Sequence, residues 1–147
     1  MRDTLALAGS EFGIRRNMFD FTRNTMDIEE ARAYCLSLPG ATEDMPYGPN
    51  WVVFRVEGKI FLHIPLERRL IAIKLAPERG EELRERYGAV RPAWHMNKRH
   101  WNDVDIEGTF PDATIKGWIA ESYALVVAKL PKRLREKYEA AAQSVME

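Results

Sequence analysis

Residues 51–75 read WVVFRVEGKIFLHIPLERRLIAIKL. Apolar side chains alternate with polar ones in three short runs, at about 51–56, 59–64 and 70–75, and a period of two predicts β-strands. Gly58 falls between the first two runs. We therefore expect a hairpin with a three-residue loop, Val56-Glu57-Gly58, in which Gly58 takes the left-handed conformation that glycine tolerates best.

This loop length determines which side chains share each face of the predicted sheet. The expected core face is aliphatic and comprises Val52, Phe54, Ile60, Leu62, Ile64, Ile71, Ile73 and Leu75. The opposite face mixes aromatic, small apolar and basic residues, namely Trp51, Val53, Phe61, Ala72, Arg55, Lys59, His63 and Lys74. On it Arg55 faces Lys59, an unfavourable pair unless solvent or an anion matches it. Two interpretations stay open: a stacking and phosphate-binding surface, or a solvated face on which long side chains cover a few apolar groups.

Helical signals flank this segment on both sides. Asp27 with Glu30 resembles a capping box, and Pro39-Gly40 ends the helix that the box opens. We expect helices at about 27–38, 77–88, 109–130 and 132–143, and two more strands around the loop at 96–99. The order lacks regular βαβ alternation. It predicts an α+β single domain with a mainly antiparallel sheet of about five strands and helices packed on one face.

The charges balance at 22 Lys plus Arg against 22 Asp plus Glu in 147 residues. A neutral chain argues against a protein whose main task is to coat nucleic acid or an anionic membrane, and no membrane partner is expected. The total nevertheless hides opposed blocks: −4 over 27–44, +3 over 51–75, +3 over 91–101, −4 over 102–112 and +4 over 129–137. Any nucleic-acid binding is therefore expected to be weak, local and salt-sensitive.

Three further features bear on the cellular setting. Cys35 is the one cysteine, so no intramolecular disulfide or cysteine metal cage forms. The longest apolar run, Tyr123–Ala128, is far below the roughly 20 residues that span a bilayer. Leu5–Ala8 is too short for a signal-peptide core. We expect a cytoplasmic protein.

Residues 1–25 form a predicted N-terminal extension to a domain at 26–147. Gly9-Ser10-Glu11-Phe12 is a tetrapeptide that adjoining cloning sites commonly encode, so part of the extension could derive from cloning. The alternative is a natural extension whose apolar residues pack on the domain: Phe12, Ile14, Met18, Phe19 and Phe21.

Residues 91–101 read RPAWHMNKRHW and contain no acid. His95 and His100 lie on opposite sides of a strand and about 140° apart on a helix, so a local histidine pair is not expected. The sequence offers no nucleophile elbow, phosphate loop or metal-ligand spacing, and we expect a non-enzymatic protein with no catalytic residue, metal or cofactor. Asn97, Lys98 and Arg99 suit a loop tip that contacts phosphate. The alternative is that Trp94 and Trp101 fill the edge of the core while the bases are solvated.

The chain resembles the MmcQ/YjbR family in three motifs: His95-Met96-Asn97-Lys98-Arg99-His100-Trp101, Ser122-Tyr123-Ala124-Leu125-Val126-Val127 and Leu130-Pro131-Lys132. Further matching pieces are Pro46-Tyr47-Gly48, Gly58-Lys59-Ile60-Phe61, Leu75 with Pro77, and Glu82-Leu83 with Tyr87. The resemblance covers about 26–138. It implies a fold similar to frataxin's, predicted DNA binding, and a double-wing motif with tips at 56–59 and 97–99. Glu57, at the tip of the first wing, does not suit phosphate binding, because its carboxylate repels phosphate.

These observations leave three hypotheses. The first is a DNA-binding module that uses Lys98, Arg99, His100, Asn97, Arg55 and Lys59. The second is a module for a small anionic ligand or a protein, using the face with Trp51, Phe61, His63 and Lys74 or a pocket near Trp94 and Trp101. The third, implied by the frataxin-like resemblance, is iron binding by Asp27, Glu29, Glu30, Glu43 and Asp44, although acids near a helix start more often serve as caps.

Overall fold

The computed structural model describes residues 25–94 and 96–146. The strands are β1 (Ala41–Asp44), β2 (Trp51–Val56), β3 (Lys59–Pro65), β4 (Leu70–Lys74), β5 (Val90–Pro92) and β6 (Trp101–Asp105). The helices are α1 (Ile28–Ser37), a 3₁₀ turn η2 (Leu66–Arg68), α2 (Pro77–Arg86), α3 (Asp112–Ala128) and α4 (Lys132–Met146). The interpretations given for residues 1–24, and the pairing of His95, lie outside the described residues.

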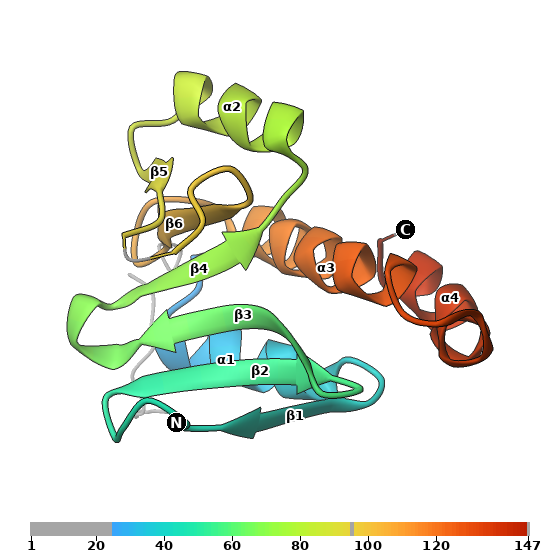
Figure 1. Cartoon of the computed structure of the whole chain (residues 1–147). Helices are drawn as coiled ribbons and strands as arrows, with labels where there is room; N and C mark the ends of the chain where they lie inside the picture. Colours follow the sequence, from blue (N-terminus) through green and yellow to red (C-terminus); the bar gives the residue numbers. More distant parts are fainter. Residues whose placement is uncertain (1–24, 95, 147) are drawn as a thin grey trace, which may run out of the picture.

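All six strands pair antiparallel in one sheet, in the order β1-β2-β3-β4-β6-β5 (Figure 1). The predicted α+β class is confirmed, and the predicted order of elements broadly agrees. The sequence did not predict β1, which forms an edge of the sheet. Its four side chains are half-buried or exposed, so the strand carries no apolar alternation to detect.

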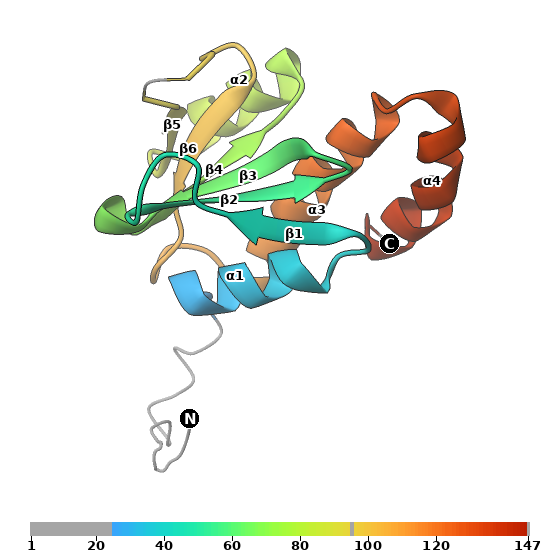
Figure 2. The ribbon, with the colours of Figure 1, turned by 60° about the horizontal axis from the view of Figure 1, so that its bottom comes forward.

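The helices bury apolar side chains against one face of the sheet. The capping box forms as expected: Glu30 N donates to Asp27 Oδ1 over 2.8 Å, and Asp27 N donates to Glu30 Oε1 over 3.0 Å. α1 and α3 lie on one side of the sheet in Figure 2, and Leu83 of α2 joins the same core. Cys35 is fully buried in α1, and its burial raises the pKa of the thiol well above the usual value.

The turn of the first hairpin differs from the prediction. Val56 pairs with Lys59, so the loop has two residues, Glu57 and Gly58, with φ of 50° and 78°. Positive φ at both positions is typical of the tight turns that suit the twist of a hairpin. Arg55 pairs with Ile60 and not with Lys59, so the expected repulsion does not arise.

A β-bulge then restores the expected faces. The register shifts between Phe54 and Arg55, so that Phe54 pairs with Leu62 and Phe61 has no cross-strand partner. From there on, the aliphatic residues face the helices as predicted. Phe61 was assigned to the wrong face: it is fully buried in the core, edge-on to the Tyr123 ring of α3 at 5.3 Å. Ile60, expected in the core, is half-buried. One inserted residue explains both differences, because it flips the side chains on the turn side of it.

β3 and β4 pair over a short stretch and then diverge (Figure 1). Their paired residues are Leu62 with Ile73 and His63 with Ala72. Beyond them, the buried hydroxyl of Ser122 in α3 bridges the gap: it donates to Phe61 O over 2.5 Å and accepts from Lys74 N over 2.8 Å. We call this the Ser122 bridge.

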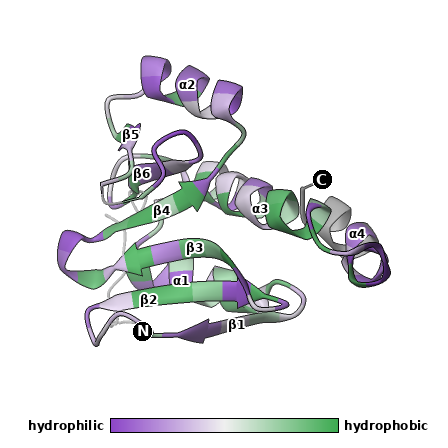
Figure 3. Ribbon diagram, viewed as in Figure 1, coloured by the Kyte–Doolittle hydropathy of each residue, from purple (hydrophilic) through white to green (hydrophobic). Residues whose placement is uncertain are grey.

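The second face of the sheet is covered by connections instead of helices. The β1–β2 connection (45–50) rises on the side opposite α1 in Figure 2, and the β5–β6 connection lies on that side too. Val53, His63 and Ala72 are buried on this face, so its centre is not the solvated surface that was one of the two interpretations from the sequence. Figure 3 shows the central strands largely apolar and α2 largely polar. Among the described residues, no helix is long and apolar enough to cross a bilayer.

Candidate functional site

Strand register brings several basic segments to one end of the sheet. The Glu57-Gly58 turn lies at this end, as does Lys74, the last residue of β4. Lys74 pairs with Trp101, so the connection before β6 starts from the same end, and His100 O accepts a hydrogen bond from Leu75 N over 2.8 Å. We call five cations of these segments the basic end. Lys59, Lys74 and Lys129 surround one depression, whereas Lys98 and Arg99 belong to the connection before β6, where Lys98 lines a separate depression with Arg68 and Arg91.

Three of these lysines surround a small depression, the lysine hollow. It has a volume of about 300 Å³ and is lined by Lys59, Lys74 and Lys129, with Ile60 and Val126 supplying apolar surface. It lies beside the Ser122 bridge, where β3 and β4 diverge. Within the part of the chain that the structure describes, none of the five basic-end cations forms an ion pair. An arrangement of unpaired amino groups attracts anions.

Most other cations already have acidic partners. Arg55 was a candidate for phosphate binding, but its Nε donates to Asp44 Oδ1 over 3.0 Å and its Nη1 to Gly58 O over 3.1 Å. Arg69 forms two hydrogen bonds with Glu107, and Arg91 two with Asp105. Among the described residues, most cations outside the basic end therefore have acidic partners, and the exceptions are Arg84, Lys132 and Arg133.

The tip of the first hairpin packs on α4. Glu57 accepts a hydrogen bond from the Tyr138 hydroxyl and lies 3.6 Å from Lys137 Nζ. The Tyr138 hydrogen bond holds the pKa of Glu57 below its usual range, with Lys137 adding to the effect. The carboxylate that seemed to oppose phosphate binding is thus already engaged with its own protein.

The 97–101 segment is a turn fixed by its own hydrogen bonds. Asn97 Oδ1 accepts from Arg99 N over 2.9 Å, and Lys98 Nζ donates to Ala93 O over 2.9 Å. Asn102, fully buried, donates to His100 O over 3.2 Å and accepts from Arg84 of α2. The Arg99 side chain is exposed, and His100 is half-buried. Lys98 and Arg99 therefore lie on a turn that is held by hydrogen bonds within the segment and to Asn102.

Beneath the two connections lies a second depression, the aromatic pocket. It is lined by Tyr47, Trp51, His63 and Met96 and has a volume of about 340 Å³. Trp51 Nε1 donates to His63 Nδ1 over 2.9 Å, and the Trp101 ring is edge-on to His63 at 4.8 Å. Burial lowers the pKa of His63 to about 4, with a smaller contribution from Arg55, so the imidazole is neutral at pH 7.

Trp94 lies apart from this pocket. It is 55% exposed, and the Arg68 guanidinium lies over its ring at 5.3 Å. Arg68 also pairs with the buried Asp103 at 3.0 Å. The structure thus brings together Trp51, His63 and Trp101, and separately Lys59 and Lys74, while Phe61 and Trp94 join neither group.

Most acidic residues proposed to bind iron already form hydrogen bonds or ion pairs with other residues of the domain. Asp27 and Glu30 form the capping box, Glu43 pairs with Arg32 at 2.6 Å, and Asp44 pairs with Arg55. Among the described residues, no group of three or more His, Cys, Asp or Glu could hold a metal ion.

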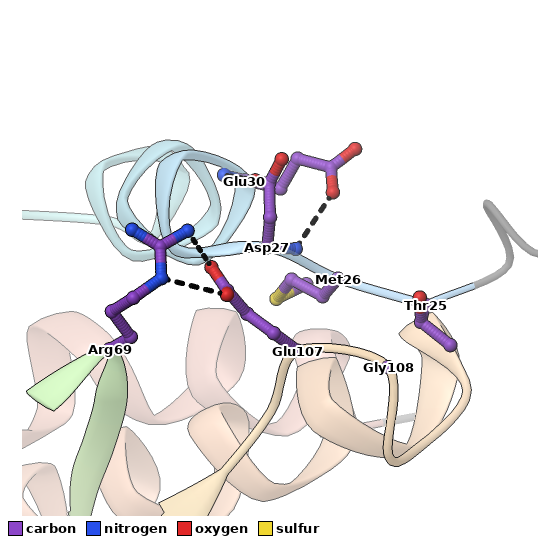
Figure 4. A pocket seen from close by; sticks show the side chains of 7 residues that line it. All are labelled: Thr25, Met26, Asp27, Glu30, Arg69, Glu107 and Gly108. Atoms are coloured by element: carbon purple, nitrogen blue, oxygen red, sulfur yellow. Dashed lines mark hydrogen bonds and ion pairs between the residues drawn. The ribbon is translucent and has the colours of Figure 1, made fainter. Parts of the chain in front are cut away.

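A hollow at the start of α1 contains charged side chains that already have partners (Figure 4). Its volume is about 300 Å³, equal to that of the lysine hollow. Here the Arg69 guanidinium is joined to Glu107, and Glu30 reaches back to the backbone of Asp27. Size alone therefore does not mark a binding site in this protein.

Sequence reasoning missed three residues of these sites. Lys129 belongs to the segment 129–137, which carries a net charge of +4. The sequence alone did not indicate that this segment lies beside the sheet. Tyr47 and Met96 appeared only within family motifs, since a connection carries no periodic pattern. Their position over His63 follows from how the two connections fold over the sheet.

Comparison with known proteins identifies the family of this chain. The YjbR family profile matches residues 36–125. The chain belongs to the YjbR family. The family includes the uncharacterized protein YjbR of Escherichia coli K12, 34% identical over 113 residues, which cover 76% of this chain and 96% of that protein. The uncharacterized protein YbdF of Escherichia coli O157:H7 is 34% identical over 108 residues, 71% of this chain and 88% of its own.

Two solved structures resemble this YjbR-family fold. Deinococcus radiodurans protein DR2400, described as a DUF419 domain, superposes with a TM-score of 0.72 at 29% identity, covering 78% of this chain and 88% of that chain. A protein from Pseudomonas syringae gives 0.59 at 28% identity, covering 68% and 98%. The resemblance stated from the motifs is confirmed at the level of the family.

Proposed function

We propose that this YjbR-family protein is a non-enzymatic DNA-binding protein of the cytoplasm, and that the basic end makes its contacts with phosphate. One observation carries the proposal: five cations without acidic partners gather at one end of a neutral protein whose other cations are mostly paired. Phosphate contacts supply most of the affinity of non-specific DNA binding, and they need accessible charges more than a basic total.

The arrangement modifies the set of residues expected from the sequence. Lys59, Lys98 and Arg99 remain contacts, with Asn97 and His100 shaping the turn that presents them. Arg55 is replaced in this role by Lys74 and Lys129, because Asp44 already neutralises it. The first hairpin contributes through Lys59 at its side, since its tip packs on α4.

Fluorescence anisotropy of a labelled duplex over a series of salt concentrations tests this proposal. Each neutralised phosphate contributes roughly −0.9 to the slope of log affinity against log salt, so five cations predict a slope of about −3 to −5. The double variant Lys59→Gln/Lys129→Gln should reduce its magnitude by roughly 2.

A matched control removes two cations that already have partners. Lys116 pairs with Asp112 and Arg86 with Glu82, so Lys116→Gln/Arg86→Gln makes the same change in net charge away from the basic end. This variant should keep the wild-type slope. Undetectable binding at low salt, or equal losses in both double variants, would contradict the proposal.

A small anionic ligand is the second candidate, favoured by the shape of the lysine hollow. Three amino groups around an apolar floor of Ile60 and Val126 could hold a compact anion. A thermal-shift screen of metabolite anions should then show stabilisation that Lys74→Ala removes. Stabilisation that persists in that variant would place the ligand elsewhere.

A further inference from the structure

We propose that the aromatic pocket holds one unpaired nucleobase, so that the preferred partner is single-stranded nucleic acid. This inference rests on the proposed function and names the form of nucleic acid that the same surface takes. It starts from the geometry of the pocket.

Two rings of the pocket are nearly parallel. The Tyr47 and His63 rings are inclined by 12°, with their centroids 6.4 Å apart, and the Trp51 ring stands edge-on to both. Carbon atoms in contact lie about 3.5–4 Å apart, so a flat ring needs roughly 7–8 Å between two parallel faces. Tyr47 is 63% exposed and comes from a connection, so its ring can move away from His63 to admit a flat ring between them.

A polar group also lines the pocket, the imidazole of His63. Because His63 Nδ1 accepts from Trp51, the neutral imidazole carries its proton on Nε2. Within the described residues, Nε2 makes no hydrogen bond. It can donate to a ring nitrogen or keto oxygen, acceptors that nucleobases carry and purely hydrocarbon rings lack.

The pocket is linked to part of the basic end through the connection before β6. Met96 lines it and directly precedes the 97–99 turn that carries Lys98 and Arg99. Trp101, in contact with His63, pairs with Lys74 across the sheet. A base in the pocket would thus have its flanking phosphates close to unpaired cations. Such phosphates favour a nucleic acid over an uncharged aromatic metabolite as the occupant.

A paired, stacked base cannot enter this pocket. In a duplex, stacking covers the faces of the bases and pairing occupies their Watson–Crick edges, whereas single strands expose both to protein side chains. An aromatic platform beside a row of cations is the combination by which single strands are held. The structure thus favours a single strand.

The test compares two single-stranded oligomers of equal length, an oligothymidylate and an oligomer of abasic residues with the same phosphates. Anisotropy should give at least about fivefold tighter binding to the thymidylate. Tyr47→Ala should abolish this difference and leave the abasic affinity unchanged. The exposed position of Tyr47 makes retention of the fold expected, and circular dichroism checks it.

Leu36→Ala is the control, since Leu36 is an apolar residue of α1, 39% exposed, away from the pocket. It should leave both affinities unchanged. Equal binding of the two oligomers, together with salt-dependent duplex binding, would overturn the pocket inference and leave the proposed function intact. Base-dependent binding that survives Tyr47→Ala would place the base elsewhere and overturn it too. If no oligomer or duplex binds, the proposed function fails, and this inference with it.

Discussion

The two faces of the sheet are both buried, but by different means. On one face, helices close over aliphatic side chains such as Val52, Leu62 and Ile73. On the other, two connections cover Val53 and Ala72 together with the polar His63. The difference teaches that a mixed pattern of aromatic and basic residues need not face solvent. Here it lines a face that connections can cover while leaving a pocket.

The largest expected effect comes from removing a buried polar contact between α3 and the helix-covered face of the sheet. Ser122→Ala removes the Ser122 bridge and leaves the buried Phe61 O and the part-buried Lys74 N without this partner. Each unsatisfied buried group costs about 1–3 kcal/mol, so the free energy of unfolding should fall by about 4 kcal/mol in urea titrations.

The control for this change is Ser37→Ala. Ser37 donates to Tyr34 O over 2.6 Å at an exposed site, where water can replace it. Its loss should change the free energy of unfolding by less than about 1 kcal/mol. Similar losses in both variants would show that the Ser122 bridge contributes no more to the free energy of unfolding than an exposed hydrogen bond does.

The next largest effect is on the pH dependence of stability. It concerns only the connection-covered face, because that face contains the buried His63. Its pKa is about 4 in the folded protein and about 6.5 when unfolded, so between these values the unfolded chain binds a proton that the folded protein excludes. Stability should therefore fall as the pH drops from 6.5 to 4, by about 3 kcal/mol from this group.

His63→Gln keeps an acceptor for Trp51 but does not titrate. Urea unfolding of this variant between pH 7 and 4 should show a shallower loss of stability than wild type. Carboxylates contribute equally to both proteins, so the difference isolates His63. Identical pH profiles would mean that His63 is as solvated in the folded protein as in the unfolded chain.

The smallest effect compares the same substitution on both faces. Val52 and Val53 are neighbours in β2, both buried, with their side chains on opposite sides. Val52→Ala should cost about 2 kcal/mol, because helices relax little around a cavity, and Val53→Ala about 1 kcal/mol, because connections adjust more easily. Equal losses in urea titrations would show that the connections pack as rigidly as the helices.

The sequence predicted the fold wherever a periodic pattern reflected burial. The aliphatic face, the capping box of α1 and the order of elements followed from such patterns. The bulge at Phe61 could not be predicted, because a two-residue turn with a bulge and a three-residue turn without one place the aliphatic residues beyond Phe61 on the same face. The faces of Ile60 and Phe61 were therefore assigned wrongly, and the cross-strand partners along β2 differ from those that a three-residue loop implies.

The candidate sites were harder to predict, for a related reason. Because β1 has no apolar pattern, Asp44 was not placed beside Arg55, and Arg55 was taken to be unpaired. Lys129 comes close to Lys59 through the packing of α3 under the sheet, a tertiary contact that no local spacing encodes. Sequence identified which cations exist, and only the fold distinguished the paired from the unpaired.

The buried Cys35 has a practical consequence for testing all of this. As the one cysteine in the chain, fully buried and with a raised pKa, its thiol should be inert to maleimide reagents in the folded state. A cysteine introduced at Leu36, which is exposed and outside the basic end and the aromatic pocket, would then take a fluorophore selectively. Energy transfer from such a label to an end-labelled oligomer could orient the nucleic acid along the sheet.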